Sequence, residues 1–186
     1  MADHERTVTG EQTVLTYSYL DEAAALALDQ AIASEEGSFY NCLCSIVMSA
    51  FCLEAYVNHV GMDRIEDWDE RAPPLDKLRR VGESLDIPIH FGRKPFQSIK
   101  LTNQFRNWMA HGRTVTLPIS YTETRPSRGK FEHSNANWQK MCSVQNAKRF
   151  LEDLEEVIGM IQERCGGEIP ELGMLGHAIW VKRSKS

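Results

Sequence analysis

From Ser38 to Val60 the chain carries a single formally charged residue, Glu54, in a stretch that is otherwise apolar or neutral. A helix that is apolar nearly all round is normally the central helix of a bundle. The stretch is also long enough to span a membrane. However, polar side chains are spread through it, no second such stretch exists, and a charge at the centre of a bilayer costs several kcal/mol. We therefore expect a buried central helix, closed by Gly61, and no contact with a membrane.

The remaining elements are predicted from apolar spacing and from residues that start or stop helices. Four further helices are expected, at 21–34 with Asp21 as its N-cap, 75–85, 95–112 and 146–165. Residues 13–20 are rich in aromatic and β-branched side chains and predict a short strand. The alternation from Thr114 to Leu117 predicts a strand or hairpin, within a loop region 113–144 that is rich in Pro, Ser and Gly.

These elements predict an all-α fold, an antiparallel helical bundle of about five helices with a small β-hairpin or loop insert after the helix 95–112. A chain of 186 residues is enough for one well-buried domain. The expected organisation is an N-terminal segment (1–20), a helical bundle (21–165, including the insert 113–144) and a C-terminal tail (166–186).

Cysteine usage and the N-terminus indicate where the chain works. Five cysteines are an odd number without a paired framework, and Cys42, Cys44 and Cys52 lie in the apolar run, where cysteine is usually a small buried hydrophobe. The charged N-terminus does not resemble a secretory signal. We therefore expect a cytoplasmic protein with reduced thiols. No zinc spacing and no glycine-rich phosphate loop is present, so neither a metal nor a cofactor is expected.

The charge distribution points to an anionic partner. The net charge is −5, but residues 71–130 hold twelve Lys/Arg and only four Asp/Glu, a local charge of +8, whereas the rest of the chain carries −13. A basic segment between two acidic parts of the chain attracts anions. The alternative is that solvated faces differ in sign by accident.

The helix 95–112 has an unusual polar face. At about 100° per residue, Leu101, Phe105, Trp108 and Met109 fall on one arc, which predicts the core face. The opposite arc carries Asn103, Gln104, Arg106, Asn107, Ala110 and His111. A merely solvated face would carry Glu, Lys or Asp, whereas these side chains bind anions or move protons. The same Arg-to-His spacing recurs at Arg128 and His133, but in a Pro/Gly/Ser-rich context without an amphipathic frame.

A helical bundle that holds R-x4-6-H, with a polar residue after the arginine, resembles the HEPN (higher eukaryotes and prokaryotes nucleotide-binding) domain. The match lies in QFRNWMAHG, at Arg106, Asn107 and His111. The apolar helix AFCLEAYVNHV resembles the family's second long helix, which commonly carries a Glu, here Glu54. The helical portion, about residues 20–165, fits the pattern, and the insert 113–144 exceeds a minimal domain.

The resemblance implies a metal-independent endoribonuclease, often a toxin or antiphage effector, that works as a homodimer with two motifs facing each other. His111 would act as general acid or base, Arg106 would hold the scissile phosphate, Asn107 would orient the phosphate or the imidazole, and Glu54 would support the arginine. Further RNA contacts are expected at Arg79, Arg80, Arg93, Lys94 and Arg113, and an antitoxin is a candidate partner.

Two other interpretations stay open. One is a non-catalytic module of the same fold that binds a nucleotide, RNA or a protein. The other is an unrelated helical protein in which the motif arose by chance, with His111 favoured only by the helix dipole. In each HEPN-like case the lone carboxylate of Glu54 needs a partner. We therefore predict that Glu54 lies within salt-bridge distance of Arg106, or shares a bridging Asn107.

Overall fold

The computed structural model describes residues 9–119, 135–166 and 176–181. This part of the chain is mostly helical, which confirms the all-α fold class, and it contains six helices and two short strands. The helices are α1 (Thr16–Ala33), α2 (Ser38–Arg64), α3 (Pro74–Ser84), α4 (Phe96–Ala110), α5 (Asn137–Met141) and α6 (Val144–Arg164). The strands are β1 (Thr9–Val14) and β2 (Gly176–Val181), which pair antiparallel.

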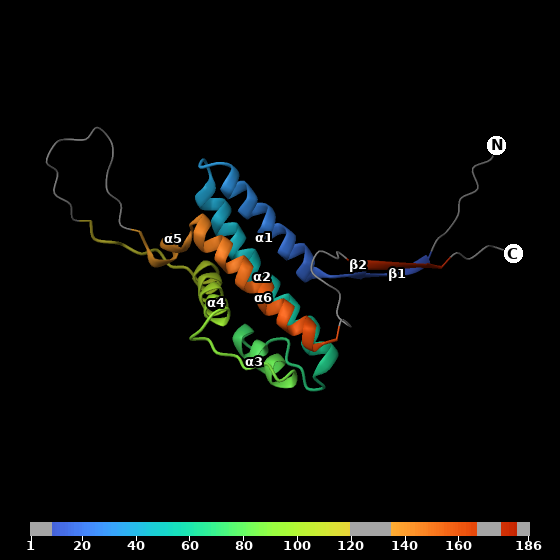
Figure 1. Cartoon of the computed structure of the whole chain (residues 1–186). Coiled ribbons are helices and arrows are strands. Elements are labelled where there is room, and N and C mark those ends of the chain that lie inside the picture. Colours follow the sequence, from blue (N-terminus) through green and yellow to red (C-terminus); the bar gives the residue numbers. More distant parts are fainter. Residues whose placement is uncertain (1–8, 120–134, 167–175, 182–186) are drawn as a thin grey trace, which may run out of the picture.

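Helix α2 is the centre of the structure, as its apolar sequence predicts. It packs against α1, α3, α4 and α6, and the three long helices α1, α2 and α6 lie side by side (Figure 1). Fully buried side chains include Ile46 and Tyr56 from α2, Phe105 from α4, and Phe150 and Ile158 from α6. Burial of this apolar surface is the main stabilising contribution to the fold.

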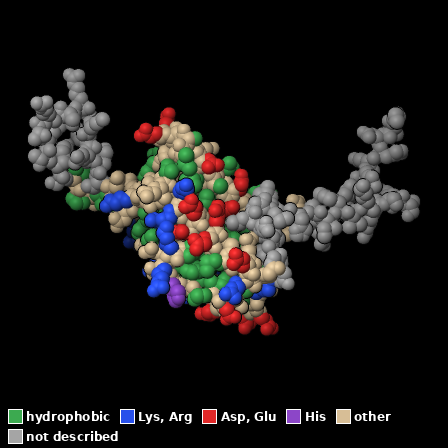
Figure 2. All heavy atoms as spheres, viewed as in Figure 1, with side chains coloured by type: hydrophobic (Ala, Val, Ile, Leu, Met, Phe, Trp, Pro, Cys, Tyr) green, Lys and Arg blue, Asp and Glu red, His purple; other side chains and the backbone are tan. Residues whose placement is uncertain are grey.

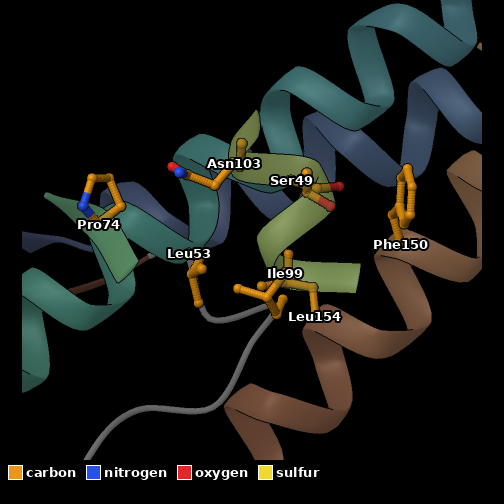
Figure 3. Close-up of a pocket in the computed structure, with 9 residues that line it drawn as sticks. Ser49, Leu53, Pro74, Ile99, Asn103, Phe150 and Leu154 are labelled. Atoms are coloured by element: carbon orange, nitrogen blue, oxygen red, sulfur yellow. The ribbon is translucent and has the colours of Figure 1, made fainter. Parts of the chain in front are cut away.

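Where the helices α2, α4 and α6 meet, the packing is almost complete. Figure 3 shows Leu53, Ile99 and Leu154 converging from these three helices around a small cavity. Its volume is about 10 Å³, room for about one water molecule. The gap is therefore a packing defect of the core and not a ligand site.

The C-terminal end of α2 differs from the prediction. Gly61 was expected to close the helix, but α2 continues to Arg64. Glycine is needed there for another reason, because a Cβ at this position would lie 2.4 Å from the indole ring of Trp68. Gly61 thus allows the segment after α2 to fold back closely against the helix.

By length and composition, α2 could also cross a membrane, and among the described helices it is the one that passes this test. Half of its most apolar window is buried inside the structure, against the neighbouring helices.

The N-terminal region was predicted only in part. A strand is present, but it is β1 at Thr9–Val14, and α1 already begins at Thr16, so Asp21 lies inside the helix and is not its N-cap. The reason is packing: the ring of Tyr17 is buried edge-on against Tyr56, with 5.1 Å between centroids. A good tertiary contact outweighs the strand preference of an aromatic residue.

The region after α4 also differs. Residues 113–119 form no strand, so the alternation Thr114–Leu117 did not predict their structure, while 120–134, including Arg128 and His133, lie outside the described residues. The structure instead places a short helix, α5, at Asn137–Met141 in what was expected to be loop. Among the cysteines, Cys42 and Cys52 are buried as expected, but Cys44 is exposed, and no disulfide joins any of the five.

Candidate functional site

Helix α4 carries Arg106 and Asn107, and its orientation is fixed by its buried face. The helix ends at Ala110, before the predicted end at Gly112, so His111 is its C-cap. Ile99, Thr102 and Phe105 are buried in the core, and Trp108 is half-buried one turn further on. The hydroxyl of Thr102 is tolerated there because it donates to the carbonyl of Ser98 at 2.8 Å. The core face is thus centred on Thr102 and Phe105, slightly rotated from the predicted arc, which turns Arg106 toward α2.

Glu54 and Arg106 form the predicted ion pair between α2 and α4. Arg106 Nη2 lies 3.2 Å from Glu54 Oε2, and each side chain is about three-quarters buried (exposed fractions 26% and 25%). The guanidinium also lies over the ring of Phe51, 5.6 Å from its centroid. The expectation that the one carboxylate of the apolar helix must be paired is therefore confirmed.

Lys77 is a member of this network that the sequence analysis missed. Its ammonium lies 3.1 Å from Glu54 Oε1, and the side chain is completely buried (0% exposed). It also donates to Asn58 Oδ1 at 3.0 Å and to the carbonyl of Glu70 at 3.1 Å, so all three N–H donors have acceptors. Lys77 belongs to α3, and the amphipathic spacing of this helix predicts an exposed lysine. Only its position between the apolar Leu75 and Leu78 indicated that the side chain is buried.

The network continues along α4 to Asn107, and His111 follows at the end of the helix. Arg106 Nη1 donates to Asn107 Oδ1 at 3.1 Å. Because arginine cannot accept a hydrogen bond, the oxygen of the amide must face it, which leaves the Asn107 Nδ2 donor for another partner. His111 follows one turn later as the C-cap, its backbone N–H donating to the carbonyl of Asn107 at 3.0 Å, and its side chain is exposed.

Asn107 and His111 line a groove of about 620 Å³ between the C-terminal end of α4, residues 112–117 and α5. Its lining includes the indoles of Trp108 and Trp138, the amides of Gln104, Asn107, Asn135 and Asn137, and the basic side chains of His111, Arg113 and Lys140. None of the described residues that line it is acidic. The groove is therefore a locally cationic surface on a chain whose net charge is −5.

Gly112 also lines this groove, directly after the C-cap of α4. A Cβ at this position would lie 2.7 Å from the carbonyl oxygen of Trp108, a clash with backbone that no side-chain movement relieves. Glycine therefore allows the chain to lie this close to the last turn of α4, directly after His111.

Arg106 itself does not belong to the described lining of the groove, because Glu54 and Asn107 hold its guanidinium at the interface with α2. In this single chain its direct effect is to orient Asn107. An arginine has five N–H donors, so those not used by Glu54 and Asn107 are left for a phosphate or a second molecule.

The other predicted cationic residues are distributed differently. Only Arg113 lines the groove. Arg79 pairs with Asp76 and lies over Phe91, and Arg80 donates to the carbonyl of Asp67 and lies over Trp68. Lys94 lies 3.9 Å from the buried carboxylate of Asp153, while Arg93 lies in the loop before α4. On the face drawn in Figure 2, Lys and Arg lie mainly toward the α4 and α5 side, and Asp and Glu dominate the centre and lower edge.

A second group of ionisable side chains lies between α1 and α6, outside the lining of the groove. Burial, and to a smaller extent the nearby carboxylates of Glu155 and Glu22, together raise the pKa of Asp21 to about 6. Asp21 Oδ1 is buried without a hydrogen-bond partner among the described residues. Burial and Glu152 likewise raise the pKa of Glu155, and burial chiefly raises that of the Cys52 thiol. This cluster therefore disfavours charge, and the lysine recorded beside it, Lys148, lies 3.7 Å from the carboxylate of Glu152.

Comparison of the chain with protein-family models, curated proteins and solved structures found no match. Among the described residues, no group of three or more His, Cys, Asp or Glu side chains is placed to hold a metal ion.

Proposed function

We propose that this protein is a metal-independent endoribonuclease of the HEPN type, with an antiparallel bundle and an insert after α4. The observation that supports it most is the placement of the motif on α4. Arg106 is anchored by Glu54 and orients Asn107, and Asn107 and His111 open into a groove whose described lining has no acid. A polyanion can approach such a groove without repulsion, whereas the acidic surface elsewhere would disfavour it.

The chemistry requires two proton transfers. The imidazole of one His111 removes the proton from a ribose 2′-OH, and the 2′-oxygen attacks the adjacent phosphorus. The bond from phosphorus to the 5′-oxygen breaks, and a second, protonated imidazole gives its proton to that leaving oxygen. The products are a 2′,3′-cyclic phosphate and a 5′-hydroxyl end. Arg106 N–H donors not used by Glu54, and the Asn107 amide, stabilise charge that develops on the phosphate.

One chain offers one His111, so the second proton-transfer group comes from a second copy. We therefore propose a homodimer in which two Arg106/His111 pairs face a common cleft. In such a cleft the arginine of one copy can reach phosphate bound in the groove of the other, which accounts for its place outside its own groove. Light scattering should give a dimer at micromolar concentration. A monomer with intact activity would contradict this assembly.

The proposed setting is the cytoplasm, where the protein would act as a toxin or as an antiphage or stress effector, with an antitoxin as a candidate partner. The direct test incubates purified protein with total cellular RNA in EDTA. Cleavage of RNA but not of DNA, which lacks the 2′-OH, is the expected result. Intact RNA under all conditions tried would contradict nuclease activity.

A second candidate function is a non-catalytic module of the same type that binds a nucleotide, RNA or protein. The observation that favours it is the engagement of Arg106 with Glu54 and Asn107, away from the described lining of the groove. On this hypothesis the wild-type protein does not cleave RNA, and His111→Ala causes only a modest loss of affinity for RNA.

A further inference from the structure

The groove beside His111 is lined by two aromatic side chains that the proton-transfer chemistry of the motif does not require. Trp108 comes from α4 and Trp138 from α5, and both line the same groove although they are thirty positions apart. Both indoles are only half-buried. Phe39 of α2 supports Trp138, with 6.2 Å between ring centroids.

The charged and polar side chains of the groove indicate the class of ligand that it fits. Arg113 and Lys140 supply positive charge, and no described lining residue supplies an opposing carboxylate. The amides of Gln104, Asn135 and Asn137 offer both donors and acceptors. A ligand that satisfies all three features has a flat aromatic part, polar edges and a negative charge. A volume of about 620 Å³ lies within the range of about 300–1,000 Å³ that is usual for small-molecule sites.

We propose that this groove binds an unpaired nucleotide, with its base stacked on Trp138 and its phosphate held by Arg113 and Lys140. The inference rests on the proposed nuclease function and identifies where a base next to the cleaved bond sits. Stacking on an aromatic side chain requires a base that is free of its own neighbours, so the site accepts single strands and rejects continuous duplex. Trp138 and Lys140 are then binding residues, distinct from the proton-transfer group at His111.

Binding can be measured without cleavage. The probe is an oligonucleotide of eight 2′-O-methyl adenosines, which lacks a free 2′-OH and so cannot react by the proposed route. A base stacked on an indole quenches its emission, so titration should lower the tryptophan fluorescence of the wild-type protein. The same oligonucleotide annealed to its complement should bind much more weakly.

Variants then assign the effect to residues. Loss of one base-stacking ring weakens binding roughly 10- to 100-fold, which is expected for Trp138→Ala when measured by anisotropy of a labelled probe, while Trp138→Phe should retain most of the affinity. Lys140→Ala should weaken binding and reduce its dependence on salt. The matched control is Lys148→Ala, an exposed lysine on α6 outside the groove, which should bind as the wild type does.

The outcomes separate this inference from the proposed function. If RNA is cleaved but Trp138→Ala and Lys140→Ala, both folded by circular dichroism, bind the probe as tightly as the wild type, the nucleotide site is refuted and the nuclease stands. Equal affinity for single strand and duplex also refutes the site. If the probe binds with the expected dependence on Trp138 but no RNA is cut, the site stands and the nuclease is refuted.

Discussion

Replacing Glu54 by glutamine should destabilise the fold by about 3 kcal/mol, because it removes the one negative charge between two cations. Its two carboxylate oxygens lie 3.1 Å from the Lys77 ammonium and 3.2 Å from the Arg106 guanidinium. Breaking a buried ion pair from one side costs about 3–5 kcal/mol, since the other charge stays buried and uncompensated. Glu54 is a quarter exposed, which places the cost near the lower limit. For a chain of this size the melting temperature should fall by roughly 6–12 °C.

The assay is urea unfolding followed by far-UV circular dichroism at neutral pH. The matched control is Glu152→Gln, which removes an exposed carboxylate 3.7 Å from Lys148 and should change stability by less than about 0.5 kcal/mol. The decisive comparison adds Lys77→Met to Glu54→Gln, because removing the uncompensated ammonium should recover part of the lost stability. Strictly additive losses, or a Glu54→Gln variant as stable as the control, would refute the electrostatic account of this network.

Two further predictions concern other parts of the fold. The raised pKa of Asp21, about 6 against an ordinary value near 4, means that folding favours its protonated form. Its contribution is therefore favourable at pH 4 and is lost as the pH rises through about 6. Relative to the wild type, Asp21→Asn should raise the free energy of unfolding by about 1 kcal/mol after screening at pH 8, and change it little at pH 4. An equal effect of the substitution at both pH values would contradict this. Gly61→Ala should destabilise the fold by about 1–3 kcal/mol, since its Cβ would meet the indole of Trp68. Gly159→Ala is the control: a Cβ there has no atom within 4 Å, so the substitution should be neutral or stabilising in the same urea titration. Equal effects of the two substitutions would contradict the steric account.

The Glu54–Arg106 pair could be predicted from the sequence because its cause is local. One carboxylate in an otherwise apolar helix must find a cation, and the Arg106 face of α4 was the best available source. Lys77 could not be found in the same way. Its burial depends on how α3 crosses α2, and its position between the apolar Leu75 and Leu78 was too weak a signal to show that this lysine faces inward.

The regions that were predicted wrongly either depend on contacts between residues far apart in the sequence or form very short elements. Tyr17 has a strand-forming side chain but lies in a helix, because its ring packs on Tyr56, 39 positions away. Thr114–Leu117 alternates like a strand but has no described strand beside it, and a strand needs a partner. Helix α5 spans five residues, too few for a periodic pattern, so the groove that its Trp138 completes could not be foreseen either.

The central claim is that His111 transfers a proton during RNA cleavage, and one comparison of variants tests it most directly. Wild-type protein, His111→Ala and His133→Ala are each incubated with the same RNA in EDTA, and the ends of the products are analysed. His111→Ala should lose cleavage by about 10²–10⁴-fold, as expected for a lost acid–base group, whereas His133→Ala should cut like the wild type and leave 2′,3′-cyclic phosphates. Equal cleavage by wild type and His111→Ala, or loss on addition of EDTA, would contradict the claim.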